Sequence, residues 1–290
     1  MLSFSNKKQL RFIITLGDSK FAGDNDTVTL QGFRASVHVD KAGGIQMSTL
    51  RARIYGISAA DMTRLASFNW KIGLWQPNKI QVFAIDGTVE TQVFAGNIVN
   101  AWADYQNMPD VFLHVQARLG ERAALAAVPP RSFKGGVDVA SVMSQIARDA
   151  GFTFENNGVD VKLSDIYLSN TALEQIKDLA KWAGIDYYLD DGVLAICPKN
   201  VPRGGLVPSI SRDTGLVGYP TFDGFGLNFQ TLFNPAVTFG GKVAVVSDVP
   251  QANGQWFVSS VAHMLDSEKP DGAWYSQIRA LPNEFSVDKR

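Results

Sequence analysis

The feature that most constrains the fold is an alternation of apolar and polar residues in the first 120 positions. Apolar residues occupy positions 37 and 39 and then 50, 52 and 54, with polar residues between them. A period of two predicts strands with one buried face. The pattern continues at 80–85, 92–98 and 111–117, separated by turn-forming residues. One short helix is expected at 59–66, capped by Ser58. We therefore expect a β-sandwich or barrel, because closure of a sheet removes its exposed edges.

The spacing of apolar residues changes near residue 121. Apolar residues at helical spacing predict helices over 137–150 and 171–183, each followed by an Ala-Gly pair that places Gly151 and Gly184 33 positions apart. Glycine at these positions suits a left-handed helix stop. Extended segments follow at 152–154 and at 185–196, the latter with a turn at Asp190-Asp191-Gly192. We expect a small α/β domain built from a duplicated helix–hairpin unit.

Segments with the residue pattern of strands resume after a Pro/Gly-rich linker at 200–209. The expected strands are 237–239, 242–247, 255–264 and 273–281. The fold class is therefore mainly β with an α/β insert, and the expected domains are 1–120, 121–199 and 200–290. The two outer regions are expected either to share one sheet or to form two barrels that face a common surface.

Composition excludes several classes of protein. Lys and Arg total 27 against 28 Asp and Glu, a formal net charge of −1, which excludes a nucleic-acid binder held by a large uniform positive field. The single cysteine, Cys197, cannot form an internal disulfide bond. No window approaches the roughly 20 apolar residues of a membrane-spanning helix, and the first residues do not resemble a signal peptide. We expect a protein that is made in the cytoplasm without stable membrane insertion.

Residues for chemistry are few and scattered. The three histidines, at 38, 114 and 263, each lie in a strand-like segment without a neighbouring ligand. Ser260, His263 and Asp266 superficially supply a nucleophile, a base and an orienting group, but positions three apart on a strand point to opposite faces. The Gly-Gly pairs, including Gly43-Gly44, lack the Lys-Ser/Thr of a phosphate loop. The carboxylate pairs Asp24/Asp26 and Asp190/Asp191 are typical of turns. We expect no catalytic residue, no metal and no cofactor.

Several segments, taken in order, resemble the baseplate hub proteins of contractile-tailed phages, a superfamily that includes tail protein D and the base of type VI secretion spikes. In the first region the resemblance rests on the segments LRARIYGISAADMTRLAS and IQVFAIDGTVETQVFAGNIVNAWADYQNMPDVFLHVQA. In the last region it rests on GYPTFDGFGLNFQTLFNPAVTFGGKVAVVS and GQWFVSSVAHMLDSEKPDGAWYSQIRA. The positions that match mark turns and strands rather than chemistry: Gly56, Phe94, Gly96, Ile98, Pro109, Asp110, Gly218, Tyr219, Pro220, Phe233, Asn234, Pro235, Gly240, Gly241 and Trp274.

The resemblance implies a structural role. A hub subunit of this family carries two tail-tube-like β-barrels that flank the α/β domain. Three subunits form a homotrimeric ring that joins the sixfold tail tube, or a tube-initiator protein, to the threefold central spike and to other baseplate proteins. DNA would pass through the lumen without specific binding, and the near-zero net charge of this chain suits such a conduit. The expected location is the phage virion.

Two alternatives stay open on the sequence. A carbohydrate- or peptidoglycan-binding tail module is suggested by the pair Trp70 and Trp75 and by the repeated helix–hairpin units. A cell-wall hydrolase is suggested by the Ser260, His263 and Asp266 cluster together with the scattered carboxylates.

Overall fold

The computed structural model describes residues 8–17, 20, 25–42, 47–66, 78–106 and 108–282. Trp70, Trp75, Asp24 and the pair Gly43-Gly44, which the sequence singles out, lie outside the described residues. The hypothesis of a sugar-stacking tryptophan pair therefore stays a prediction.

Within the described residues, the first β region has seven strands and one helix, and most of its strands follow the predicted alternation. Alternate residues of β3 point into an apolar core, and the same holds for β4. The short helix α1 begins after Ser58, whose hydroxyl oxygen accepts a hydrogen bond from Asp61 N at 3.1 Å, and it buries Met62 and Leu65 as expected. The elements are β1 (Lys8–Thr15), β2 (Thr27–Gln31), β3 (Ala35–Ala42), β4 (Thr49–Tyr55), α1 (Ala59–Leu65), β5 (Lys79–Asp86), β6 (Val89–Asp104) and β7 (Phe112–Arg118).

The second β region contains six strands, and three of its four predicted strands are present. The elements are β13 (Ser209–Ile210), the 3-10 helix η1 (Arg212–Thr214), β14 (Leu216–Phe222), β15 (Leu227–Leu232), β16 (Lys242–Val245), the 3-10 helix η2 (Pro250–Ala252), β17 (Gly254–Ser267) and β18 (Trp274–Pro282). The strand predicted at 237–239 is wrong. Asn234 turns the chain there by accepting a hydrogen bond from Ala236 N at 3.0 Å, and Gly241 N donates to Thr238 O at 3.1 Å.

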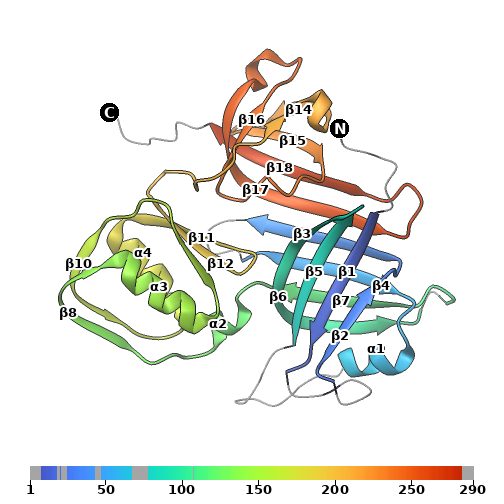
Figure 1. The fold of residues 1–290 in the computed structure, drawn as a ribbon, viewed down its shortest axis with the longest axis horizontal. Coiled ribbons are helices and arrows are strands. Elements are labelled where there is room, and N and C mark those ends of the chain that lie inside the picture. Colours follow the sequence, from blue (N-terminus) through green and yellow to red (C-terminus); the bar gives the residue numbers. More distant parts are fainter. Residues whose placement is uncertain are drawn as a thin grey trace.

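The two β regions share one sheet, which is antiparallel except where β13 pairs in parallel with β16. Its strand order is β14-β15-β18-β17-β3-β4-β7-β6-β5-β1-β2, with β16 attached beside β17 and β13 attached beside β16. The join is the pairing of β17 with β3, which runs from Ser260 opposite Ala42 to Ser267 opposite Ala35. Figure 1 shows β17 passing from the upper, orange part of the molecule down beside the blue strand β3. The shared sheet that the sequence offered as one arrangement is therefore present.

Each β region keeps an apolar core of its own. Leu10, Phe12, Ile54 and Phe94 lie in the first core, and Ile210, Phe229, Val243 and Ile278 lie in the second. Among the described strands, β14 and β2 end the hydrogen-bonded path, and no strand pair joins these two ends. Two barrels, each closed on itself, therefore stay a prediction from the sequence, and so do the domain boundaries at 120 and 199.

The insert packs two helices between two small sheets. Its elements are α2 (Glu121–Leu125), β8 (Arg131–Asp138), α3 (Val139–Ala150), β9 (Thr153–Asn156), β10 (Lys162–Leu168), α4 (Ala172–Ala183), β11 (Ile185–Asp190) and β12 (Val193–Pro198). Strands β8 and β10 curve around the outside of α3 and α4 (Figure 1), and the buried faces of both helices form a third apolar core. Both helices end as predicted, because Gly151 and Gly184 have φ of 80° and 63°.

The duplication extends to the helices but not to the hairpins. Strands β11 and β12 form the expected antiparallel hairpin. After α3, however, β9 pairs in parallel with β12, and β10 pairs with β8. The pattern also predicted a helix start at 137, whereas Asp138 ends β8 and caps α3 by accepting a hydrogen bond from Ser141 N. A unit of one helix followed by one strand is thus repeated, but the two strands pair differently: β9 is parallel to β12, whereas β11 is antiparallel to it.

Candidate functional site

The positions that carry the resemblance in the first region are structural. Phe94 and Ile98 are buried on β6. Between them, a Cβ added to Gly96 would lie 2.7 Å from the backbone oxygen of Arg118, so only glycine fits. Gly56 follows β4 with a φ of 79°, in the left-handed region. Pro109 lies in the β6–β7 hairpin loop, and Asp110 there faces Arg34 at 3.6 Å.

The corresponding positions of the second region form three groups. Phe233 and Trp274 come together with ring centroids 5.9 Å apart, and both pack against the core of the first region. Gly218, Tyr219 and Pro220 form an irregular part of the edge strand β14, where Tyr219 is 68% exposed. The remaining positions, Asn234, Pro235, Gly240 and Gly241, form the turns that precede β16.

The arrangement of Ser260, His263 and Asp266 does not make a catalytic triad. His263 lies on the buried face of β17, is 3% exposed, and has its Nδ1 2.7 Å from the hydroxyl of Ser276. Burial, and then the nearby charge of Lys41, hold the pKa of His263 well below its ordinary value. Ser260 lies instead on the opposite face, in a surface hollow. The carboxylate of Asp266 accepts hydrogen bonds from Ala273 N and from Lys269.

A buried ionic joint connects the insert to both β regions. We define the joint as Lys41, Glu155, Asp190, Asp191 and Arg203. Lys41 extends from the end of β3 into the β11–β12 turn, where its Nζ contacts Asp191 Oδ2 and lies 3.1 Å from Asp190 Oδ1. The side chain of Lys41 is 8% exposed, which makes this a desolvated contact rather than a surface ion pair.

Arg203 completes the joint from the side of the second β region. Its guanidinium contacts Glu155 Oε2 at 2.8 Å and the carbonyl oxygen of Phe239 at 3.4 Å. Its backbone N–H donates to Gly240 O at 2.8 Å. Gly240 also has no room for a side chain, because a Cβ there would lie 2.8 Å from the ring of Tyr188 on β11. The insert is therefore fitted closely against both β regions at this point.

The electrostatics of the joint follow from its burial. Burial alone would disfavour the charge of Lys41, but the two aspartates outweigh it and raise the pKa of Lys41 above its ordinary value. Burial raises the pKa of Asp191 to about 6, against the pull of Lys41 and with a contribution from the charge of Asp190. Hydrogen bonding from Arg203 lowers the pKa of Glu155.

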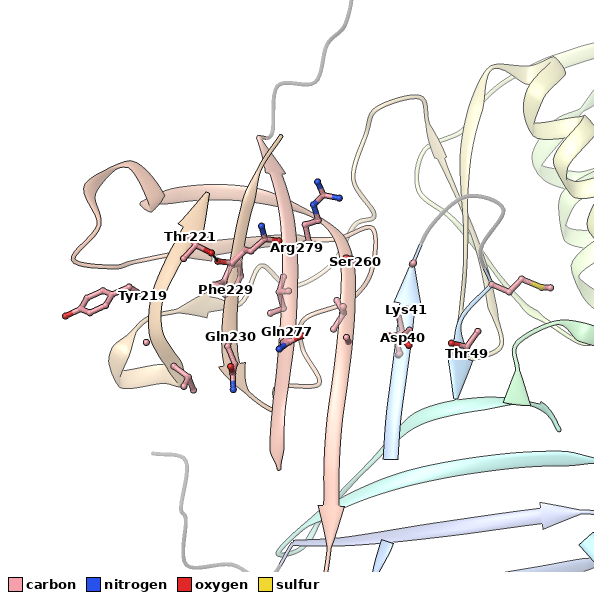
Figure 2. A pocket seen from close by; sticks show the side chains of 18 of the residues that line it. Asp40, Lys41, Thr49, Tyr219, Thr221, Phe229, Gln230, Ser260, Gln277 and Arg279 are labelled. Atoms are coloured by element: carbon pink, nitrogen blue, oxygen red, sulfur yellow. Dashed lines mark hydrogen bonds between the residues drawn. The ribbon is translucent and has the colours of Figure 1, made fainter. Parts of the chain in front are cut away.

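A broad hollow with a mixed polar and apolar lining lies on the outer face of the shared sheet. It has a volume of about 1030 Å³ and crosses β14, β15, β18, β17, β3 and β4. Figure 2 shows its side chains on successive strands, with Tyr219 pointing away from the sheet at the β14 edge. We call this surface the shared face and define it by Asp40, Thr49, Asn228, Gln230, Ser260, Gln277 and Arg279. Its composition offers hydrogen bonds and mixed charges but no convergent catalytic groups.

A match to a protein-family model shows which family this chain belongs to. A family model described as baseplate hub gp41 matches residues 11–277, which is most of the chain. The chain belongs to the baseplate hub gp41 family. This hub protein is accordingly a structural component of a phage tail baseplate. No curated protein sequence matches it.

Solved structures similar to the hub protein agree with this assignment at the level of the fold. A 43 kDa tail protein of prophage MuSo2 from Shewanella oneidensis has a TM-score of 0.63 at 12% identity, covering 96% of this chain and 97% of that one. A type VI secretion component of E. coli, itself described as similar to T4 tail proteins gp27 and gp5, gives 0.54 at 9%, covering 86% and 73%. The Francisella PdpA-VgrG complex gives 0.56 at 9%, covering 98% and 59%.

In the described ranges, no three His, Cys, Asp or Glu side chains gather as metal ligands would. None of the helices found there has the length and apolar character needed to cross a bilayer.

Sequence reasoning missed the ionic joint of the hub protein, although one signal for it was present. The alternation that buries Val37 and Val39 also assigns Lys41 to the buried face of the same strand. A lysine at a buried position calls for a carboxylate partner. The turn aspartates supply that partner, but their proximity depends on how the insert folds back, which spacing does not reveal.

Proposed function

We propose that three copies of this hub protein form a ring that adapts the sixfold tail tube, or a tube-initiator protein, to the threefold central spike. Each copy contributes two β regions, so three copies present six similar wall segments toward the tube while keeping threefold symmetry toward the spike. Other baseplate proteins bind around this ring. The protein is made in the host cytoplasm and assembles there into the virion tail without membrane insertion.

The observation that carries this proposal is the shared sheet. Because β17 pairs with β3, the two β regions of one subunit are held in a fixed relation by an unbroken ladder of hydrogen bonds. A connector between two symmetries needs this property, since its two wall segments must keep a constant spacing and angle under load. A flexible tether between separate barrels would not supply it.

The shared face is proposed to line the channel through which DNA passes. The arginines on and beside this face are matched by carboxylates: Arg51, next to the face on β4, lies 3.2 Å from Asp40, and Arg279 lies 3.0 Å from Asp223. Arg118, at the rim of the hollow, is paired with Glu121 at 3.2 Å. Paired charges create little net attraction for phosphate, so DNA would slide past without counterion-driven binding.

The role is proposed to be non-enzymatic. His263, the base of the suggested hydrolase cluster, is buried against Ser276 and Phe233, where a cell-wall substrate would not reach it. Zymography on peptidoglycan should therefore show no clearing, and His263→Ala should behave as the wild type in that assay.

Mass measurement tests the assembly. Native mass spectrometry of the purified protein, alone and with its spike protein, is expected to give a trimer in at least the second condition. A low-resolution image of that complex should show a threefold ring with six wall segments around a channel. A strictly monomeric species in both conditions would overturn the proposal.

A further inference from the structure

A second cavity separates the insert from the second β region. It has a volume of about 510 Å³ and lies between α4 and β11 on one side and the ends of β17 and β18 on the other. Its walls are mainly apolar and aromatic, with contributions from Ile185, Tyr187, Tyr188, Phe239, Phe257 and Leu281. Burial raises the pKa of both tyrosines, as expected for rings that are well covered. Cavities of about 300–1,000 Å³ with such walls are typical of binding sites.

Strand β11 presents a free edge to this cavity. The small sheet has the order β11-β12-β9, so β12 occupies one side of β11 and no described strand occupies the other. Residues Ile185 to Tyr188 of β11 line the cavity directly. A free strand edge carries unpaired N–H and C=O groups, which accept an added extended segment.

The mouth of the cavity carries two lysines and one aspartate. Lys177 and Lys181 lie one helical turn apart on α4, and both are exposed. In the part of the chain that the structure describes, neither has a carboxylate oxygen within 4.0 Å. The carboxylate of Asp186, also at the mouth, already accepts a hydrogen bond from Asn200 N at 2.7 Å. Two like charges at this spacing destabilise a helix slightly, although Lys181, in the last turn of α4, also interacts favourably with the helix dipole.

We infer that this cavity binds an extended segment of a partner protein, which adds a strand to β11, places alternate apolar side chains in the cavity and presents acidic residues to Lys177 and Lys181. The inference goes beyond the proposed ring, because it concerns the insert. The two end strands of the large sheet in a second copy fit poorly: β14 is interrupted at Pro220, and β2 has five residues without a carboxylate.

Selection from a display library of random 12-residue peptides tests this inference on the full chain. The expected binders have apolar residues at alternate positions and at least two acidic residues at one end. For a fluorescein-labelled peptide of this type, Lys177→Glu combined with Lys181→Glu should weaken binding at least tenfold, measured by anisotropy. The matched control reverses two exposed lysines elsewhere on the insert, Lys134→Glu with Lys162→Glu, and should change binding less than twofold.

Hydrogen exchange separates strand addition from simple charge attraction. Bound peptide should slow exchange of the amides at 185–190 at least tenfold and leave those of α3 unchanged. Unchanged exchange at 185–190, or equal peptide binding by the two charge-reversal variants, would overturn the inference. Ser259→Trp fills the cavity, so peptide binding by this variant as tight as that of the wild type would also overturn the inference. If the Lys177/Lys181 variant without peptide has a different oligomeric mass from the wild type, the site would be assigned to a second copy of the chain instead. The ring proposal is unaffected by these outcomes, because it is tested by mass with the spike.

Discussion

Removal of the positive charge at the centre of the ionic joint should destabilise the hub protein strongly. Lys41→Met keeps most of the aliphatic stem of the side chain and removes only the ammonium group. The side chain of Lys41 is 8% exposed and that of Asp190 is 7% exposed, so the carboxylates left behind are mostly desolvated. Breaking a buried pair from one side costs about 3–5 kcal/mol.

Lys8→Met is the matched control. Lys8 also contacts an aspartate, Asp86, but these two side chains are 23% and 33% exposed. An ion pair with this much solvent contact is worth about 0–1 kcal/mol. The two variants therefore remove the same chemical group from contacts that differ in burial and in the number of aspartate partners, two for Lys41 and one for Lys8, and the expected difference between them is several kcal/mol.

Urea unfolding followed by circular dichroism measures the two losses, and limited proteolysis shows where the structure opens. Lys41→Met should lower the unfolding midpoint clearly and increase cleavage near residues 199–209, where the insert connects to the second β region. Adding Asp190→Asn and Asp191→Asn to Lys41→Met should restore part of the loss, since no buried charge then lacks a partner. Equal midpoints for Lys41→Met and Lys8→Met would refute the reasoning from burial.

Three further predictions concern other parts of the molecule. Gly96→Ala should lower stability by about 1–3 kcal/mol in urea unfolding, because the new methyl group meets the backbone oxygen of Arg118. Asp191 has a pKa of about 6 in the folded protein and an ordinary value of 3.8. Its contribution to stability is therefore complete below about pH 4 and is lost as the pH rises through 6, which lowers the free energy of unfolding by up to about 3 kcal/mol. Asp191→Asn should abolish this part of the pH dependence. Asp40→Asn with Asp223→Asn should free two arginines of the shared face and increase DNA binding in low salt, measured by mobility shift.

Each of these predictions has a result that contradicts it. Gly136→Ala, where a Cβ meets no atom within 4 Å, should cost far less than Gly96→Ala, and equal costs would reject the steric argument. A stability difference between wild type and Asp191→Asn that does not change between pH 4 and pH 7 would exclude the raised pKa. Unchanged DNA binding after both aspartate substitutions would mean that charge pairing is not what keeps the shared face from binding DNA.

The sequence predicted most of the strands because burial of one sheet face leaves a period of two. It failed where local chemistry competes with that period. Residues 237–239 read as a strand, but Asn234 accepts a hydrogen bond from the backbone two residues later and turns the chain. Strands β8 and β10 carry weak alternation, since most of their residues are not buried, and were not predicted.

Long-range partners were the part that sequence reasoning could not supply. The repeat of Gly151 and Gly184 correctly gave two helix ends, yet it also suggested two hairpins, whereas β9 pairs in parallel with β12. The candidate site depends on the same kind of information. Lys41 and Asp191 are 150 positions apart, and only the fold brings them together.

The length and position of β17 have a mechanical consequence. Its first half pairs with β16, its second half pairs with β3, and β18 runs alongside most of it. A force applied to one β region is therefore transmitted to the other along β17. The hydrogen bonds between β17 and its neighbours would be loaded in shear and would not open one at a time. A subunit built in this way would tilt as one piece when a load is applied to either β region.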